Sequence, residues 1–111
     1  IPPEPAKIPN LMNYFVYNYN HDEEYIFNKI AKYHIDFERI HPFEDGNGRT
    51  GRLLINYELV KNNLPPAVIE KDDRVKYFEF LRNVDYIGLA GWIKELSTDE
   101  NDRMKKFGYE E

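Results

Sequence analysis

The run from His41 to Arg52, HPFEDGNGRTGR, brings together residue types that can bind an anion beside a proton acceptor. Gly46, Gly48 and Gly51 are three of the six glycines in the chain. Glycine lets backbone N–H groups turn toward a ligand in conformations that residues with a Cβ rarely adopt. A helix that begins near Gly48 adds the unpaired N–H groups and the positive dipole of its first turn. The run therefore predicts a nest for a phosphate group.

The charged residues of this run supply the other parts of phosphoryl-group transfer. Arg49 and Arg52 are three residues apart, so they share one face of the first helical turn and can both bind phosphate oxygens. Asp45 is a carboxylate that can hold Mg²⁺ together with phosphates and water. His41 can accept a proton near neutral pH, which is the task of a general base. The alternative is a glycine-rich connection between helices in which His41 only caps a helix end.

The elements on both sides of this run are predicted to be helices, because apolar residues recur every three or four positions and no alternating strand pattern occurs. Pro42 disfavours helical geometry at His41, so one helix ends just before the run. Asp22 is the expected N-cap of that helix. The predicted helices span residues 11–19, 23–40, 49–62, 73–84 and 86–107. The sequence therefore predicts an all-α domain in which the run connects two helices.

The apolar spacing also predicts which side of each helix is buried. The predicted inward residues are Leu11, Met12, Phe15 and Val16; Ile26, Ile30, Tyr33, Phe37 and Ile40; Leu53, Tyr57 and Val60, with Leu54 beside them; Tyr77, Phe80 and Leu81; and Trp92, Ile93 and Leu96. His34 lies on the same helix as the longest of these stripes. We expect it to be a hydrogen-bonded packing residue rather than a catalyst.

Length and composition limit the classes of protein to consider. The 111 residues form one domain, and 41% hydrophobic and 15% aromatic content indicates a packed core. Residues 97–111 are a tail that can lie outside that core. The absence of cysteine excludes disulfides and thiolate metal sites and fits a reducing compartment. A net charge of −5 argues against binding of nucleic acid or anionic membranes. The chain begins at Ile1 without methionine, so we expect a piece of a longer protein.

The run resembles the signature of the Fic family, HPF-x-(Asp/Glu)-Gly-Asn-(Gly/Lys)-Arg-x-x-Arg, and meets every fixed position of it. The similarity extends to residues 34–40 before the run and to residues 53–56 and 63–66 after it. Ile1-Pro2-Pro3 resembles the end of the β-hairpin flap of this family. The resemblance covers roughly residues 1–96. It implies a compact helical domain with the active-site loop between two central helices and with most of the flap upstream of Ile1.

The resemblance implies a protein adenylyltransferase, which moves AMP from ATP to a Ser, Thr or Tyr hydroxyl of a target protein, its own tyrosines included. By similarity, His41 is the general base and Asp45 holds Mg²⁺. The residues that bind the nucleotide phosphates by similarity are Gly46, Asn47, Gly48, Arg49, Thr50, Gly51 and Arg52. Gly48 stands where the related Doc kinases carry Lys, which favours nucleotide transfer over phosphate transfer.

Two further positions are assigned by similarity alone. Tyr77 would line the nucleotide pocket, and Asp85 stands where an Asn often contacts the base. Asp85 leaves the donor open, so removal of AMP or transfer from another nucleotide or phosphodiester donor remains an alternative. A nucleotide-binding module that is inactive through truncation is another.

The implied partners are ATP and the target protein. An inhibitory segment or an antitoxin would come from outside this chain. We expect a cytoplasmic protein if it is bacterial, with a secreted effector as the alternative.

Overall fold

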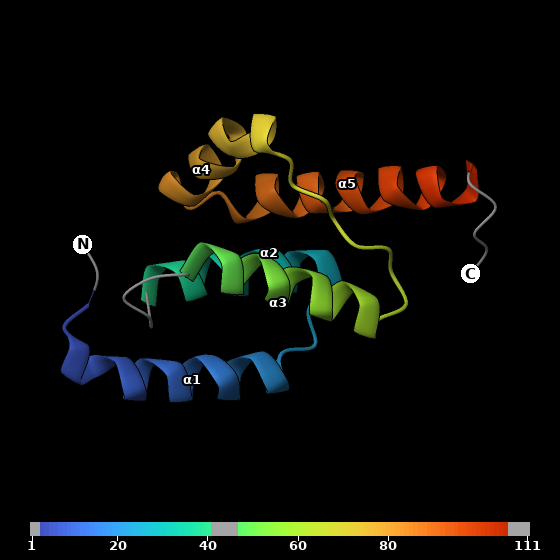
Figure 1. Cartoon of the computed structure of the whole chain (residues 1–111). Helices are drawn as coiled ribbons and strands as arrows, with labels where there is room; N and C mark the ends of the chain where they lie inside the picture. Colours follow the sequence, from blue (N-terminus) through green and yellow to red (C-terminus); the bar gives the residue numbers. More distant parts are fainter. Residues whose placement is uncertain (1–2, 41–46, 107–111) are drawn as a thin grey trace.

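Five α-helices account for most of the residues that the computed structural model describes, which are residues 3–40 and 47–106 (Figure 1). The described residues contain no strand, so the all-α prediction is confirmed. In chain order the elements are η1 (Pro5–Lys7), α1 (Ile8–His21), α2 (Ile26–Ile40), α3 (Asn47–Lys61), η2 (Lys71–Asp73), α4 (Arg74–Arg82) and α5 (Tyr86–Lys106).

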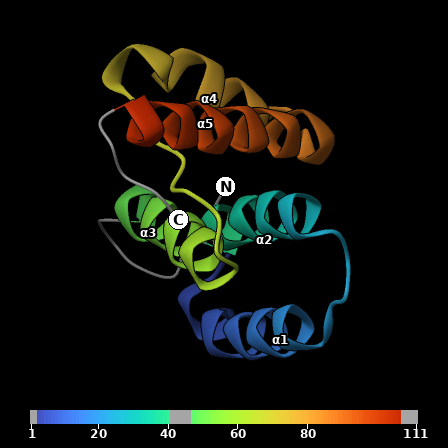
Figure 2. The same cartoon turned by 90° about the vertical axis from the view of Figure 1, so that its right-hand side faces the viewer.

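The helices form three layers, with α2 and α3 side by side in the middle (Figures 1 and 2). α1 covers one side of this pair, and α4 and α5 cover the other side. α2 contacts α1, α3 and α5. Its position explains its composition, because a helix that is covered on several sides must be apolar on several faces.

Two clusters of side chains bury the faces of α2. The main core joins Phe27, Ile30, Ala31 and Ile35 of α2 to residues of α3, α4 and α5, among them the fully buried Leu89 and Ile93. An aromatic cluster fills the other side, toward α1. There the Phe15 ring lies 5.7 Å from the Tyr33 ring and 6.0 Å from the Phe37 ring, measured between centroids. The predicted stripe of α2 is therefore confirmed.

The predicted buried stripe of α3 is wrong. Leu53, Tyr57 and Val60 are 70%, 63% and 59% exposed, and Leu54 is 40% exposed. The buried face of α3 instead carries Gly51, Ile55 and Leu59, which are four residues apart. α3 has apolar residues around most of its circumference, so spacing alone could not show which side faces α2. Leu11 and Val16 of α1 are likewise exposed, at 36% and 49%.

The predicted N-cap at Asp22 is also wrong. Asp22 follows the last residue of α1, and its Oδ1 atom accepts the backbone N–H of Glu24 at 2.8 Å. This side-chain turn holds the chain out of helical geometry, so α2 begins at Ile26 rather than near residue 23.

The connection from α3 to η2 is hydrogen-bonded to α3 and to α5. Two residues after the end of α3, Asn63 lies in the left-handed region at φ 61°, and the N–H of Leu64 donates to the carbonyl of Leu59 at 2.9 Å. Farther on, Asn56 of α3 accepts the N–H of Ala67 at 2.9 Å. The buried hydroxyl of Ser97 on α5 donates to the carbonyl of Pro65 at 2.6 Å. These bonds hold the connection between α3 and α5.

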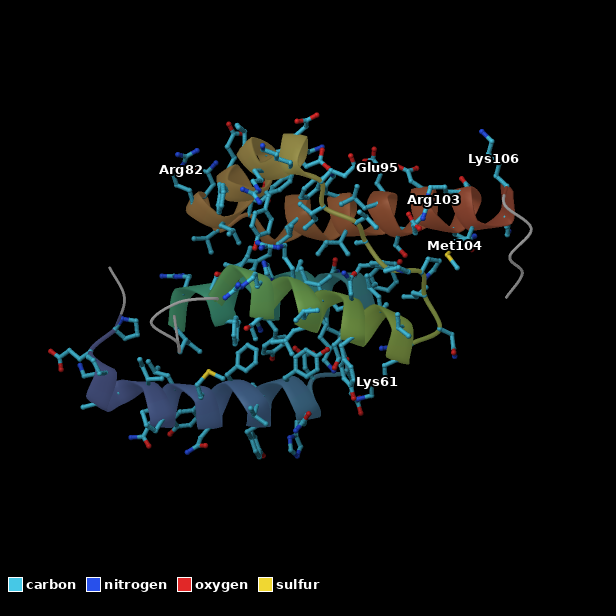
Figure 3. All side chains as sticks on the ribbon, viewed as in Figure 1. Lys61, Arg82, Glu95, Arg103, Met104 and Lys106 are labelled. Carbon is cyan, nitrogen blue, oxygen red and sulfur yellow. The ribbon has the colours of Figure 1, made fainter. Side chains whose placement is uncertain are left out.

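Charged side chains lie on the outer surface of the layers. Figure 3 shows Arg82, Glu95 and Lys106 directed away from the central helices, and all three are exposed. Within the described ranges, none of the helices combines the length and the apolar character that crossing a bilayer requires.

Candidate active site

The signature run meets the described structure at the start of α3. His41, Asp45 and Gly46 lie outside the described residues, so their roles stay predictions. Asn47 is the first residue of α3, and its side chain is not described. Gly48, Arg49, Thr50, Gly51 and Arg52 then form the first turns of this helix. The structure therefore confirms that the run leads into a helix N-terminus.

The first turn of α3 has an unfavourable charge for a helix N-terminus. It contains no acidic residue. Arg49 and Arg52 place positive charge beside unpaired N–H groups that are already at the positive end of the dipole. A bound anion removes the conflict, because it can accept hydrogen bonds from both the backbone and the guanidinium groups.

The two arginines differ in their surroundings. Arg49 is exposed, whereas Arg52 is half-buried. Nη1 of Arg52 lies 3.0 Å from the point that a Cβ atom on Gly48 would occupy. On its other side, Cζ of Arg52 lies 5.8 Å from the centroid of the Tyr77 ring. The guanidinium group of Arg52 is thus placed between the first turn of α3 and an aromatic ring of α4.

Tyr77 is only 1% exposed and belongs to the main core. Its hydroxyl lies 2.6 Å from Nε2 of His34, which is 5% exposed. The prediction that His34 is a hydrogen-bonded packing residue is therefore confirmed. Tyr77 meets the signature run through Arg52. A direct contact between Tyr77 and a nucleotide stays a prediction.

Burial sets the protonation of this pair. It lowers the pKa of His34 to about 4; the backbone of Gly51 opposes this shift and the positive charge of Arg52 adds to it. His34 is therefore neutral at pH 7. Burial also raises the pKa of Tyr77, and the negative charge of Glu38 adds to this effect. The hydrogen bond therefore joins two neutral groups.

Gly51 lies on the face of α3 that packs against α2. A Cβ atom at this position would be 2.8 Å from Cε1 of His34 and closer still to Oε1 of Glu38. The glycine thus allows these two side chains of α2 to reach the inner face of α3. Sequence reasoning did not find Glu38. Its spacing of four residues from His34 on one helix was the available signal.

Asp85 lies between α4 and α5. Its Oδ1 atom accepts the backbone N–H of Gly88 at 2.9 Å, so it caps the N-terminus of α5. The residue itself is exposed. Figure 1 shows that the turn between α4 and α5 lies at the same end of the molecule as the start of α3. Asp85 therefore has a structural role, as a helix cap, that sequence reasoning did not predict.

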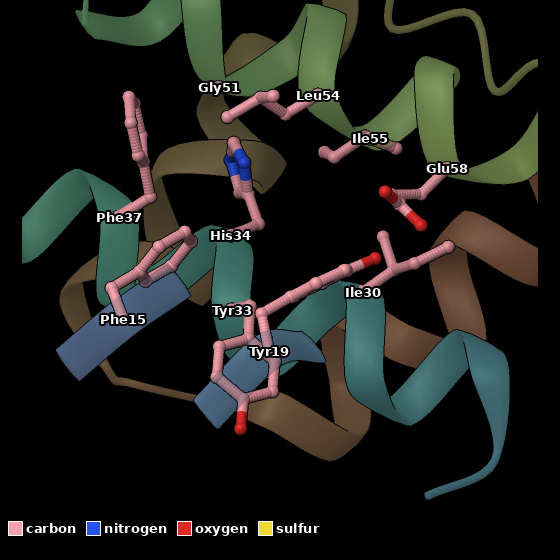
Figure 4. A pocket seen from close by; sticks show the side chains of 10 residues that line it. All are labelled: Phe15, Tyr19, Ile30, Tyr33, His34, Phe37, Gly51, Leu54, Ile55 and Glu58. Carbon is pink, nitrogen blue, oxygen red and sulfur yellow. The ribbon is translucent and has the colours of Figure 1, made fainter. Parts of the chain in front are cut away.

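Two hollows adjoin these residues. One, of about 240 Å³, borders Arg52 and Asn56 of α3 and residues 67–69 of the connection. The other, of about 100 Å³, lies between α1, α2 and α3, and His34 points from its α2 side toward Gly51 (Figure 4). This second cavity is smaller than the roughly 300–1,000 Å³ of ordinary ligand pockets and is lined mainly by apolar groups. Of the two hollows, the one beside Arg52 is the larger and has the more polar lining.

The metal prediction rests on the sequence alone. Within residues 3–40 and 47–106, no group of three or more His, Cys, Asp or Glu side chains could hold a metal ion. The predicted ligand Asp45 lies between these ranges.

Comparison with known proteins agrees with this geometry. The model of the Fic/DOC family matches residues 1–59, which are more than half of the chain, and the chain therefore belongs to this family. It is 40% identical over 85 residues to the protein adenylyltransferase Fic of Aedes aegypti, and 41% identical over 85 residues to that of Drosophila melanogaster. Each alignment covers 74% of this chain but 17% of the relative. The chain thus spans about a sixth of the length of these relatives.

The fold is similar to that of a solved Fic-domain protein. A crystal structure of a Fic domain containing signaling protein from Bacteroides thetaiotaomicron matches with a TM-score of 0.72 and 29% sequence identity. The match covers 87% of this chain and 41% of that one. The architecture described above is therefore a Fic-domain fold.

Proposed function

We propose that this chain is the catalytic core of a protein adenylyltransferase, which transfers AMP from ATP to a hydroxyl of a target protein. The observation that carries the proposal is the start of α3. Two arginines lie in its first turns, and the guanidinium group of Arg52 is placed against the ring of Tyr77. Relatives that are about 40% identical are named protein adenylyltransferase Fic, which supports the same activity for this core.

In this proposal each residue of the signature run has its own role in the reaction. His41 accepts the proton of the target hydroxyl, whose oxygen forms a bond to the α-phosphorus of ATP. The bond from that phosphorus to the oxygen bridging to the β-phosphate breaks, and pyrophosphate leaves. The N–H groups at the start of α3 and the side chains of Arg49 and Arg52 bind the phosphate oxygens and neutralise their charge. Asp45 would hold Mg²⁺, which supplies further charge neutralisation when it is bound.

The geometry at Gly48 supports nucleotide transfer over phosphate transfer. A Cβ atom at this position would lie 3.0 Å from Nη1 of Arg52, which is a tight contact. A longer side chain, such as the Lys of the Doc kinases, would compete with Arg52 for the same space. Glycine leaves that space to the guanidinium group.

Transfer from labelled ATP tests the proposal. The chain is incubated with Mg²⁺, a protein substrate mixture and ATP labelled at either the α- or the γ-phosphate. We expect label on protein only from the α position, and none with His41→Ala. His21→Ala, which changes an exposed histidine of α1, is the matched control and should transfer label normally. Label from the γ position alone would mean a kinase and would overturn the proposal.

Asp85 favours a second candidate, transfer from another donor. Its carboxylate caps the N-terminus of α5, and by similarity it stands where an Asn often contacts the base. A carboxylate cannot donate the hydrogen bonds that an amide donates. Thermal shifts with ATP, GTP, CTP and UTP separate the candidates, since a ligand at a hundredfold excess over Kd adds about 2.7 kcal/mol. A shift with another nucleotide and none with ATP would favour the second.

A further inference from the structure

Three helices each contribute one side chain to a continuous contact that ends at the candidate site. His34 of α2 is hydrogen-bonded to the hydroxyl of Tyr77 of α4, with 2.6 Å between Nε2 and the oxygen. The guanidinium group of Arg52 on α3 lies over the ring of Tyr77, with Cζ 5.8 Å from the ring centroid. The His34 and Tyr77 rings also contact each other, at 5.6 Å between centroids. The contact runs from the core to the surface.

Burying the polar groups of His34 and Tyr77 in the core costs free energy that burying two apolar side chains would not cost. A buried hydroxyl and a buried imidazole must satisfy each other, whereas two apolar side chains would pack without that requirement. His34 and Tyr77 are 5% and 1% exposed, so their polar atoms are shielded from water. What the polar pair provides, and an apolar pair would not, is a fixed direction for the Tyr77 ring and hydroxyl.

The guanidinium group of Arg52 has neighbours on two sides. Its Nη1 atom lies 3.0 Å from the place of a Cβ on Gly48, so the guanidinium group rests against the backbone of the first turn. The ring of Tyr77 borders it from α4. Arg49, three residues earlier, is exposed and has no comparable support among the described contacts. The two arginines therefore differ in how firmly they are held.

We propose that His34 and Tyr77 are positioning residues that fix the guanidinium group of Arg52 for the outer phosphates of a nucleotide. The proposal rests on the proposed function in one respect, the identity of the ligand. An arginine that is already ordered loses less conformational freedom when it binds phosphate, so the support of Tyr77 should appear as tighter binding of the polyphosphate. Loss of the support by Tyr77 should not change the binding of nucleotide groups farther from Arg52, such as the base.

Two conservative variants test this. Tyr77→Phe keeps the ring and removes the hydroxyl. His34→Gln replaces the imidazole by a side-chain amide. Tyr57→Phe, the same substitution at a tyrosine of α3 that is 63% exposed, is the matched control. Calorimetric titration of each protein with ATP and with AMP gives the affinities. We expect Tyr77→Phe and His34→Gln to weaken ATP binding roughly five- to tenfold, the effect of one lost hydrogen bond. AMP binding should stay within twofold of the wild type.

Additivity is the second criterion. If the two residues act through each other, the double variant should lose no more ATP affinity than the more damaging single variant. Equal losses for ATP and AMP would mean that Tyr77 contacts the base or supports the whole site, and they would overturn the proposal. Unchanged ATP affinity in both single variants would also overturn it.

A measurement without nucleotide separates this proposal from the proposed function. In the ¹⁵N-labelled chain, the Nε–H signal of Arg52, assigned with Arg52→Lys, gives a heteronuclear NOE that reports the order of the side chain. The NOE should fall in Tyr77→Phe and in His34→Gln but not in Tyr57→Phe. An unchanged NOE in both would overturn the positioning role. A fall in the NOE together with a wild type that binds neither ATP nor AMP would keep the positioning role and reject the proposed function.

Discussion

Acid should destabilise this protein through His34. Its pKa is about 4 in the folded state and 6.5 for an ordinary histidine. Between these pH values the unfolded chain binds a proton at His34 and the folded protein does not. The stability that depends on neutral His34 is present above pH 6.5 and is lost as the pH falls from 6.5 to 4. Between pH 7 and pH 5 this single group should reduce the free energy of unfolding by about 2 kcal/mol.

Urea unfolding at pH 7, 6 and 5 measures this loss, and the fluorescence of Trp92, the only tryptophan, reports unfolding. His34→Gln removes the titrating group, so its stability should fall by about 2 kcal/mol less than that of the wild type over this range. His21→Gln changes an exposed histidine and is the matched control. Parallel losses in the wild type and in His34→Gln would refute the reasoning, because His34 would then titrate alike in the folded and unfolded states.

Three further predictions concern stability and can be checked by urea unfolding at pH 7. Leu59→Ala removes a fully buried side chain of α3 and should cost about 2–5 kcal/mol, whereas Leu53→Ala, on the 70% exposed side of the same helix, should change stability by less than about 0.5 kcal/mol. Similar costs for the two would contradict the assignment of the buried face. Ser97→Ala removes the donor to the Pro65 carbonyl and should cost about 1 kcal/mol; no loss would mean that water replaces it. Asp85→Ala should cost about 1 kcal/mol and Asp85→Asn much less, since Asn also caps helices; equal losses would argue against the cap.

The helices were predictable because local rules decide them. The stripe of α2 repeats over four turns, and a helix of that length is specified by its own sequence. The start of α3 was predictable because glycines and arginines in one short run have few structural uses. These features needed no knowledge of neighbouring segments.

The errors came from packing, which the sequence of one segment does not contain. Leu53 and Ile55 are both apolar and lie on different sides of α3, and only the position of α2 decides which side is buried. The bond between His34 and Tyr77 joins residues 43 positions apart, so neither residue alone pointed to the other. Asp85 was noticed for its chemistry, whereas its cap became visible only with the start of α5.

The order in which this chain can assemble follows from the position of its last helices. α2 is covered by α5, and the bond from Tyr86 to Asp36 spans 50 positions, so the core closes only after loops of that length have formed. The signature run precedes α4 and α5 in the chain, so it is synthesised before them. Until α4 has folded, the ring of Tyr77 is not in place beside Arg52. The surroundings of Arg52 are therefore complete only after α4 and α5 have packed onto the rest of the core.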